Sequence, residues 1–170
     1  MDEFGDYTLT LDEGLNALAE GQIVSDTFEY TISDGFGGTD TATVTVTVTG
    51  QNDDPVAGDD FLVAFDFGLV GNLFDSNDGP ADYDPDTNDV LSVVAVSGGT
   101  PVQGGFIIEL LGEGGPAALI ISTNGDVEVL SDGAFDVFEI IDFTYEVSDG
   151  HGGTDRALAT VIVDILLPPA

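Results

Sequence analysis

Carboxylates occupy alternate positions in one acidic segment of the chain, and alternate carboxylates can converge on a cation when the backbone curls. The segment holds Asp82, Asp84, Asp86 and, further on, Asp89. This spacing begins like an EF-hand calcium loop, but Thr87 stands where that loop needs Gly and Val93 where it needs Glu. An EF-hand is therefore excluded. A calcium site of another kind and a solvated acidic loop both stay open.

A second acidic stretch covers residues 52–60 and is interrupted by Pro55. Its candidate ligands are Asn52, Asp53, Asp54, Asp59 and Asp60. Calcium takes about six to eight oxygen ligands and accepts carbonyls as well as carboxylates. We expect residues 52–60 to be a linker between two units that either binds calcium, together with loops of its neighbours, or acts as a flexible acidic hinge.

The third acidic motif is a turn that the chain contains twice. Residues 33–40 read SDGFGGTD and residues 148–155 read SDGHGGTD. An Asx-turn explains Asp34 and Asp149 without a metal, and metal ligation is the alternative. His151 stands where the first copy has Phe36, which argues against a catalytic or zinc-binding role for this histidine.

The charge balance limits the partners of the chain. It has 33 acidic residues and a single base, Arg156, for a formal net charge of −32. Nucleic acids and anionic membranes are bound through Lys and Arg, and the apolar stretches are too short to span a bilayer. We expect neither nucleic-acid binding nor membrane insertion. The counter-charge must come from solution, as calcium or as the salt of a halophilic environment, and the clustering of Asp with Gly, Asn and Pro favours calcium.

Little in the composition could perform catalysis. There is one histidine and there are no cysteines, and carboxylates are so numerous that a pair of them does not indicate a glycosidase. We expect no enzymatic activity. The chain also has no Trp to stack on a sugar, which leaves Tyr83 of the acidic loop as the aromatic residue that could contact a polysaccharide.

The repeated turn joins two strand patterns. Residues 41–49 alternate threonine with apolar residues, which is typical of a strand buried on one face. The two copies align at one constant offset, with Phe28 and Tyr30 matching Phe143 and Tyr145. Upstream, Gly5-Asp6 matches Gly125-Asp126. A fixed internal period marks an array of like units.

The patterns predict an all-β chain made of tandem antiparallel β-sandwiches, one partial and one complete. Residues 1–51 form the partial unit, with three strands and a short helical turn at 13–20. The complete sandwich spans residues 61–165, and residues 166–170 form a tail. Its further strands are expected at 61–67, 69–74, 90–96, 105–111, 117–122 and 126–130. The partial unit is a piece of a longer array, is completed by strands of a neighbouring chain, or packs against the complete unit.

Longer stretches support a family resemblance. GDYTLTL, DTFEYTISDGFGGTDTATVTVTVTG and NDDPVA resemble the bacterial VCBS-type repeat. PVAGDD, DPDTNDVL and FTYEVSDGHGGTD are similar to bacterial cadherin-like domains of the kind found in RTX adhesins. The resemblance implies Ig/cadherin-like sandwiches in secreted, calcium-binding proteins of the bacterial surface, where such modules are spacers and some bind polysaccharide.

These observations predict a calcium-stiffened extender of a bacterial surface adhesin or extracellular fibre, in contact with neighbouring repeats. Two alternatives stay open: a calcium-dependent polysaccharide-binding module, and a filament subunit completed by strands of a neighbouring chain. The expected location is extracellular, on the cell surface, although the first residues show no signal peptide.

Overall fold

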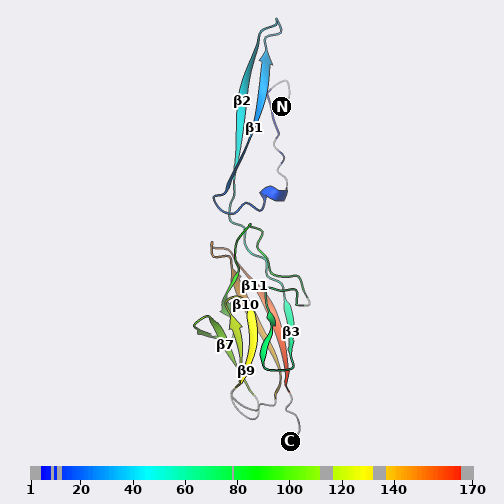
Figure 1. Ribbon diagram of the computed structural model, residues 1–170, viewed down its shortest axis with the longest axis vertical. Helices are drawn as coiled ribbons and strands as arrows, with labels where there is room; N and C mark the ends of the chain where they lie inside the picture. Colours follow the sequence, from blue (N-terminus) through cyan, green and yellow to red (C-terminus); the bar gives the residue numbers. More distant parts are fainter. Residues whose placement is uncertain are drawn as a thin grey trace. The chain divides into compact units, whose positions relative to one another are not determined.

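The computed structural model describes residues 5–8, 10, 13–77, 79–111, 117–131 and 137–165. The chain divides into two compact units. Unit 1 contains residues 1–52 and 86–88, and unit 2 contains residues 53–85 and 89–170. Several strands of each unit are labelled in Figure 1.

Unit 1 is a long β-hairpin preceded by a single short helical turn. Strands β1 (Ile23–Ser33) and β2 (Thr39–Thr49) pair antiparallel along their whole length (Figure 1), after the 3-10 turn η1 (Glu13–Leu15). Gly35 and Gly37 have positive φ where the hairpin reverses, a conformation that costs glycine little. The period-two pattern therefore predicted this hairpin correctly.

Two expected features of unit 1 are different in the structure. The helical turn ends at Leu15 instead of continuing to residue 20, because so short a segment does not offset the cost of helix nucleation. Residues 5–8, expected to belong to a third strand, contain no strand. The Tyr7 ring instead lies 6.2 Å from the Phe28 ring, centroid to centroid.

Unit 2 is a sandwich of two sheets. One has the strand order β3-β11-β10-β5 and the other β4-β9-β8-β7-β6. The strands are β3 (Asp60–Ala64), β4 (Gly68–Asn72), β5 (Ser92–Val96), β6 (Thr100–Val102), β7 (Gly105–Leu110), β8 (Ala117–Ser122), β9 (Asp126–Ser131), β10 (Val137–Ser148) and β11 (Thr154–Ile165).

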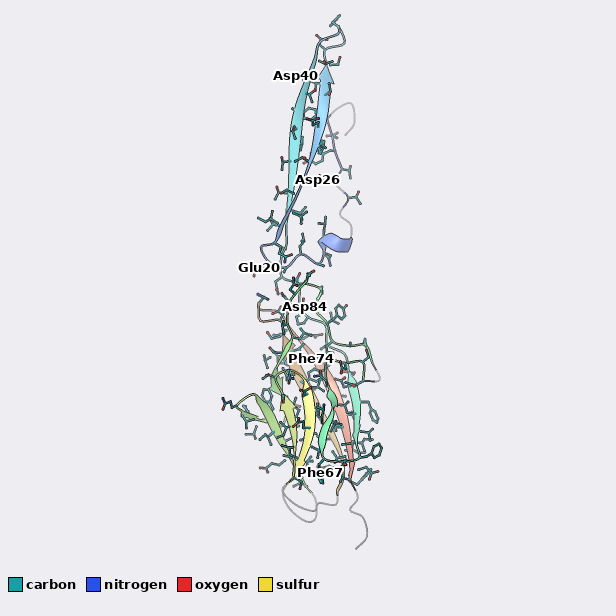
Figure 2. All side chains as sticks on the ribbon, in the orientation of Figure 1. Glu20, Asp26, Asp40, Phe67, Phe74 and Asp84 are labelled. Atoms are coloured by element: carbon teal, nitrogen blue, oxygen red, sulfur yellow. The ribbon has the colours of Figure 1, made fainter. Side chains whose placement is uncertain are left out.

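The core of unit 2 lies between these sheets. Buried residues alternate with more exposed ones along β8 and β11, and the largest fully buried side chains include Phe143, Tyr145, Leu73, Leu119 and Ile121. Phe67 and Phe74, labelled in Figure 2, pack against this core while remaining partly exposed. Burial of apolar area at about 25 cal/mol per Å² is the main force holding the two sheets together.

The expected all-β architecture with tandem sandwich-type units is confirmed, with two differences in detail. Strand β3 pairs with β11 in parallel, with Leu62 opposite Val161, so the sandwich is not purely antiparallel. Strand β6 was not expected from the sequence, because three residues show no periodicity. The direction of a strand depends on contacts with distant segments, which a local apolar pattern does not report.

The segment expected as a linker is bound to unit 2 over most of its length. Val56 forms a β-bridge with Tyr83, and the Ala57 amide donates to Asp155 Oδ2 at 2.9 Å. The expected tail at 166–170 lies outside the described residues. Within the described part of the chain, no helix has the length and apolarity needed to cross a bilayer.

Candidate metal centre

Three carboxylates converge in unit 2. Asp84, Asp89 and Asp149 each offer one oxygen, and these oxygens all lie within 4.8 Å of one another. Asp84, labelled in Figure 2, and Asp89 belong to the loop between β4 and β5. Asp149 opens the turn between β10 and β11 and is 3% exposed. Two sequence motifs far apart along the chain thus form one acidic cluster.

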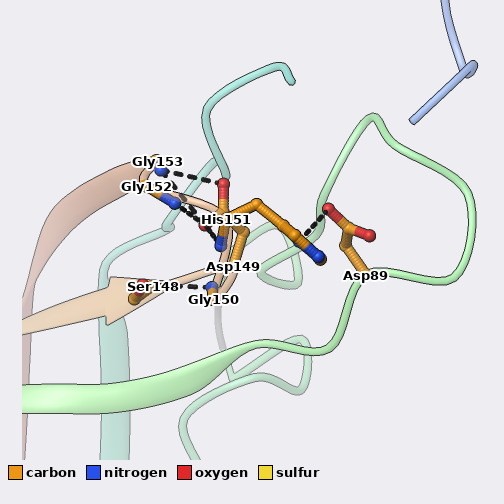
Figure 3. A network of polar contacts seen from close by, with 7 residues as sticks. All are labelled: Asp89, Ser148, Asp149, Gly150, His151, Gly152 and Gly153. Carbon is orange, nitrogen blue, oxygen red and sulfur yellow. Dashed lines mark hydrogen bonds and ion pairs between the residues drawn. The ribbon is translucent and has the colours of Figure 1, made fainter. Parts of the chain in front are cut away.

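Asp149 is held by the backbone of its own turn. Its Oδ1 accepts hydrogen bonds from the amides of His151 at 2.7 Å, Gly152 at 3.0 Å and Gly153 at 3.1 Å (Figure 3). In unit 1, Asp34 Oδ1 likewise accepts from the amides of Phe36 and Gly38. The prediction that both aspartates form Asx-type turns is therefore confirmed. In unit 2 these hydrogen bonds fix the orientation of the Asp149 carboxylate.

Gly153 lets a further carboxylate approach the turn. A Cβ at this position would overlap Asp149 Oδ2 and would come within 2.9 Å of Asp54 Oδ1. The space that a side chain would fill is therefore bordered by two carboxylates. The linker motif contributes to this region of the molecule through Asp54.

Few positive groups are available to balance this cluster. His151 Nδ1 lies 3.0 Å from Asp89 Oδ2 (Figure 3), with the histidine side chain 52% exposed and that of Asp89 6% exposed. The Arg156 guanidinium is engaged elsewhere, 2.6 Å from Glu146 Oε2. Because its counterpart is Phe36, we expected no catalytic or zinc-binding role for His151. The structure nevertheless places His151 beside the cluster. The difference between Phe36 and His151 in the two copies of the turn was the feature of the sequence that could have indicated this.

Asp60 and Asp82 belong to a separate buried network. The Tyr145 hydroxyl lies 2.9 Å from Asp60 Oδ2, from Asp82 Oδ2 and from the Gly58 carbonyl oxygen. A hydroxyl has one proton to donate, so it cannot satisfy all three acceptors unless a carboxyl carries a proton of its own. Burial raises the pKa of Asp60 to about 6 and also raises that of Asp82.

The other predicted ligands are not members of this group of three carboxylates. The exposed Asp59 accepts a hydrogen bond from the Leu158 amide at 2.8 Å. Asn52 and Asp53 are half-buried and Asp86 is 3% exposed. Among the described residues, no second group of three His, Cys, Asp or Glu side chains converges in this way. Calcium ligation by any of the predicted residues stays a prediction.

The oxygen ligands of the cluster are of the kind that a hard cation prefers. All three side chains offer carboxylate oxygens, which suit calcium or magnesium better than zinc or copper. Three anionic side chains within 4.8 Å of one another also repel, and a divalent ion would relieve that repulsion. The residues present therefore fit calcium.

The family model described as bacterial Ig domain matches residues 2–47 and 52–162. The chain belongs to the bacterial Ig domain family. Domains of this family are typically structural modules without enzymatic activity, located outside the cell or on its surface. The expectation of a surface-type, non-enzymatic module is thereby supported at the level of the family.

This bacterial Ig chain is also similar to solved cadherin structures. One is mouse cadherin-23 EC22-24, with 10% identity and a TM-score of 0.46, covering 83% of this chain and 42% of that chain. Another is the protocadherin gammaB7 EC3-6 cis-dimer, with 14% identity, a TM-score of 0.43 and coverage of 82% and 32%. The chain thus spans less than half the length of either. No curated protein matches it.

Proposed function

We propose that this chain is a calcium-stabilised structural module of a bacterial surface adhesin or extracellular fibre. The proposal depends on one observation, the convergence of Asp84, Asp89 and Asp149, in a chain whose single arginine pairs with Glu146. The family supports an extracellular structural role. Calcium held by these carboxylates would tie the β4–β5 loop to the turn of β10–β11 and so stiffen unit 2.

The stabilisation has a calculable size. An ion that binds only the folded state at a free concentration ten times its dissociation constant adds about 1.4 kcal/mol to the free energy of unfolding. The two segments it would join lie far apart in sequence, so their separation on unfolding would release the ion. Calcium therefore acts as a reversible cross-link of the sandwich in this proposal.

A calcium titration followed by calorimetry and melting temperature tests the site. We expect the wild type to bind calcium and to melt at a higher temperature when it is bound. The variant Asp84→Asn with Asp89→Asn should lose both effects, because two of the three carboxylates become neutral. Asp75→Asn, which removes one charge from an exposed position of unit 2, serves as the control and should respond like the wild type. An unchanged response in the double variant would rule out this site.

The role as an extender concerns neighbouring repeats, and small-angle X-ray scattering tests it. We propose that bound calcium reduces motion along the chain, so the maximum dimension in calcium should exceed that in chelator and should vary less among conformers. Equal scattering curves in the two conditions would contradict the extender role while leaving calcium binding itself intact.

Binding of an extracellular polysaccharide is a second proposal, favoured by the position of Tyr83. Its side chain is 54% exposed next to Asp84, and its backbone is fixed by the bridge to Val56. A cation at the cluster could bridge acidic sugars to this anionic surface. Tyr83→Ala should abolish calcium-dependent glycan binding. Phe65→Ala, another exposed aromatic residue of unit 2, should not. Glycan binding that survives Tyr83→Ala would contradict the proposal.

A further inference from the structure

Hairpin β1–β2 has one face composed like a protein core. The register places Val24 opposite Val48, Phe28 opposite Val44 and Tyr30 opposite Ala42 on the same side. None of these side chains is buried in unit 1. Together with Tyr7 and Leu15, this face borders a hollow of about 750 Å³. Apolar side chains at this density are normally buried against another layer.

The other face needs no cover, because apart from Ile23 and Glu29 all of its side chains are those of serine or threonine. Ser25 and Thr47 hydrogen bond across the strands at 3.2 Å, and so do Thr31 and Thr41. Such a face is stable in water. Any partner layer must therefore lie on the apolar side, where Asp26 and Asp40, both labelled in Figure 2, are the acidic residues among the apolar ones.

The repeated hairpin of unit 2 shows what this face is built to contact. Five of its inward positions carry the same residues as unit 1: Phe143, Tyr145, Ala157, Val161 and Val163 correspond to Phe28, Tyr30, Ala42, Val46 and Val48. In unit 2 these side chains are at most 5% exposed. They are covered by the sheet β4-β9-β8-β7-β6. The same residues in the same register are thus core in one unit and at least partly exposed in the other.

The outer strand edges of the two hairpins also differ, because those of β10–β11 pair with further strands. In unit 2, β11 also pairs in parallel with β3, and β10 also pairs antiparallel with β5. In the described part of unit 1, β1 and β2 pair only with each other. Unpaired edges and an isolated two-stranded sheet are both unfavourable in water.

We propose that hairpin β1–β2 forms part of a second Ig-like sandwich. The occupant of its apolar face is a set of strands that correspond to β3–β8 and are joined to the chain upstream of Gly5. Unit 2 gives the order: β3 to β8 come first, then Gly125-Asp126, then the hairpin. Gly5-Asp6 matches Gly125-Asp126, so Tyr7 takes the place of the fully buried Val127. The occupant adds a strand parallel to β2 and a strand antiparallel to β1.

A fusion protein tests this directly. A copy of residues 53–124 is joined to Gly5 and followed by the rest of the chain, and hydrogen exchange of β1 and β2 is measured by mass spectrometry. In the unfused chain we expect these amides to exchange roughly 100-fold or more faster than those of β10 and β11. In the fusion they should approach the slow rates of β10 and β11, because the face and both edges are then covered.

The matched control is the same fusion with Leu119→Ser and Ile121→Ser in the added copy only, which spoils the covering sheet and leaves unit 2 intact. This control should exchange as fast as the unfused chain. The hairpin carries Ile32 and Val44 where β10 and β11 have Val147 and Ala159. A second fusion with Ile32→Val and Val44→Ala removes that extra volume, so a packing mismatch is also tested.

Three results would overturn the proposal. The first is a monomeric unfused chain in which β1 and β2 are already as protected as β10 and β11. The second is protection that rises with protein concentration together with dimer formation in the ultracentrifuge, which would make a second copy the occupant. The third is the absence of added protection in both fusions relative to the serine control. None of these results depends on calcium.

Discussion

Asp149 and Asp34 accept similar backbone hydrogen bonds in their turns, yet among the described residues only Asp149 belongs to a group of three carboxylates. The turn therefore fixes a carboxylate in place whether or not other acidic residues surround it. What distinguishes unit 2 is that Asp84 and Asp89 reach its turn. The ligating capacity of this motif depends on its neighbours, since one carboxylate alone does not satisfy a calcium ion.

Gly153→Ala should destabilise unit 2 by about 1–3 kcal/mol. The added methyl group would overlap Asp149 Oδ2 and crowd Asp54 Oδ1, so the turn would have to shift. Chemical denaturation of the variant measures the loss. Gly99→Ala is the control, because its Cβ would meet its nearest atoms at 3.2 Å and need displace them only slightly. Equal losses in the two variants would contradict this explanation.

The buried Asp60 carboxyl predicts a pH dependence with a definite sign. Its folded pKa of about 6 lies above its ordinary value of 3.8. The stability it contributes is therefore fully present below about pH 4 and is lost as pH rises through about 6. Unit 2 should unfold more easily at pH 7 than at pH 5.

Asp60→Asn isolates this effect, because Asn remains neutral and still offers an oxygen to the Tyr145 hydroxyl. The fall in unfolding free energy between pH 5 and about pH 7 should be smaller in this variant. Asp82 stays in place and retains part of the dependence, since burial raises its pKa as well. The measurement is urea denaturation at several pH values, with Asp75→Asn as the control. An identical pH profile in wild type and Asp60→Asn would refute the assignment.

The two hairpins are a natural comparison at the level of the element. They share the turn, the period-two pattern and most inward residues, but within the residues that the structure describes only β10–β11 has a sheet over its apolar face. A hairpin without a covering layer is marginally stable at best in water. Local sequence thus determines the hairpin, and packing determines how much stability it contributes.

Truncation of matched phenylalanines tests that difference. Phe143→Ala removes a fully buried ring and should cost unit 2 about 3–5 kcal/mol. Phe28→Ala removes a half-buried ring and should cost much less. Calorimetry of both variants against the wild type gives the two values. Similar losses would mean that the apolar face of β1–β2 is covered in solution.

For the whole molecule, the net charge of −32 makes the stability of the fold depend on the ions in solution. Added salt screens repulsion between exposed carboxylates over a Debye length of about 10 Å at 0.1 M. A general halophilic surface and a calcium site therefore respond differently to cations. The first responds to ionic strength, and the second to the identity of the ion.

Melting curves at matched ionic strength separate the two. We expect millimolar calcium to raise the melting temperature more than sodium chloride of the same ionic strength, because carboxylates that converge bind a divalent ion specifically. Magnesium serves as the divalent control and should act less, since it demands a more regular octahedral geometry. Equal shifts with all three salts would favour a salt-adapted surface without a calcium site.

The sequence by itself determined the local features of this protein. The period of two in residues 41–49 specifies a strand buried on one face, and the repeated SDGxGGTD turn specifies a hairpin and an Asx-type cap. The acidic composition predicts that nucleic acids and anionic membranes are not partners. These features follow from side-chain spacing and backbone preferences within a few residues, which a single sequence displays.

Only the tertiary structure decided which carboxylates meet. Asp84 and Asp89 reach Asp149, whereas the equally acidic Asp60 and Asp82 turn toward Tyr145. The parallel pairing of β3 with β11 and the proximity of His151 to Asp89 were likewise invisible in the sequence. These contacts join segments far apart in the chain, and they depend on how the sheets pack as a whole.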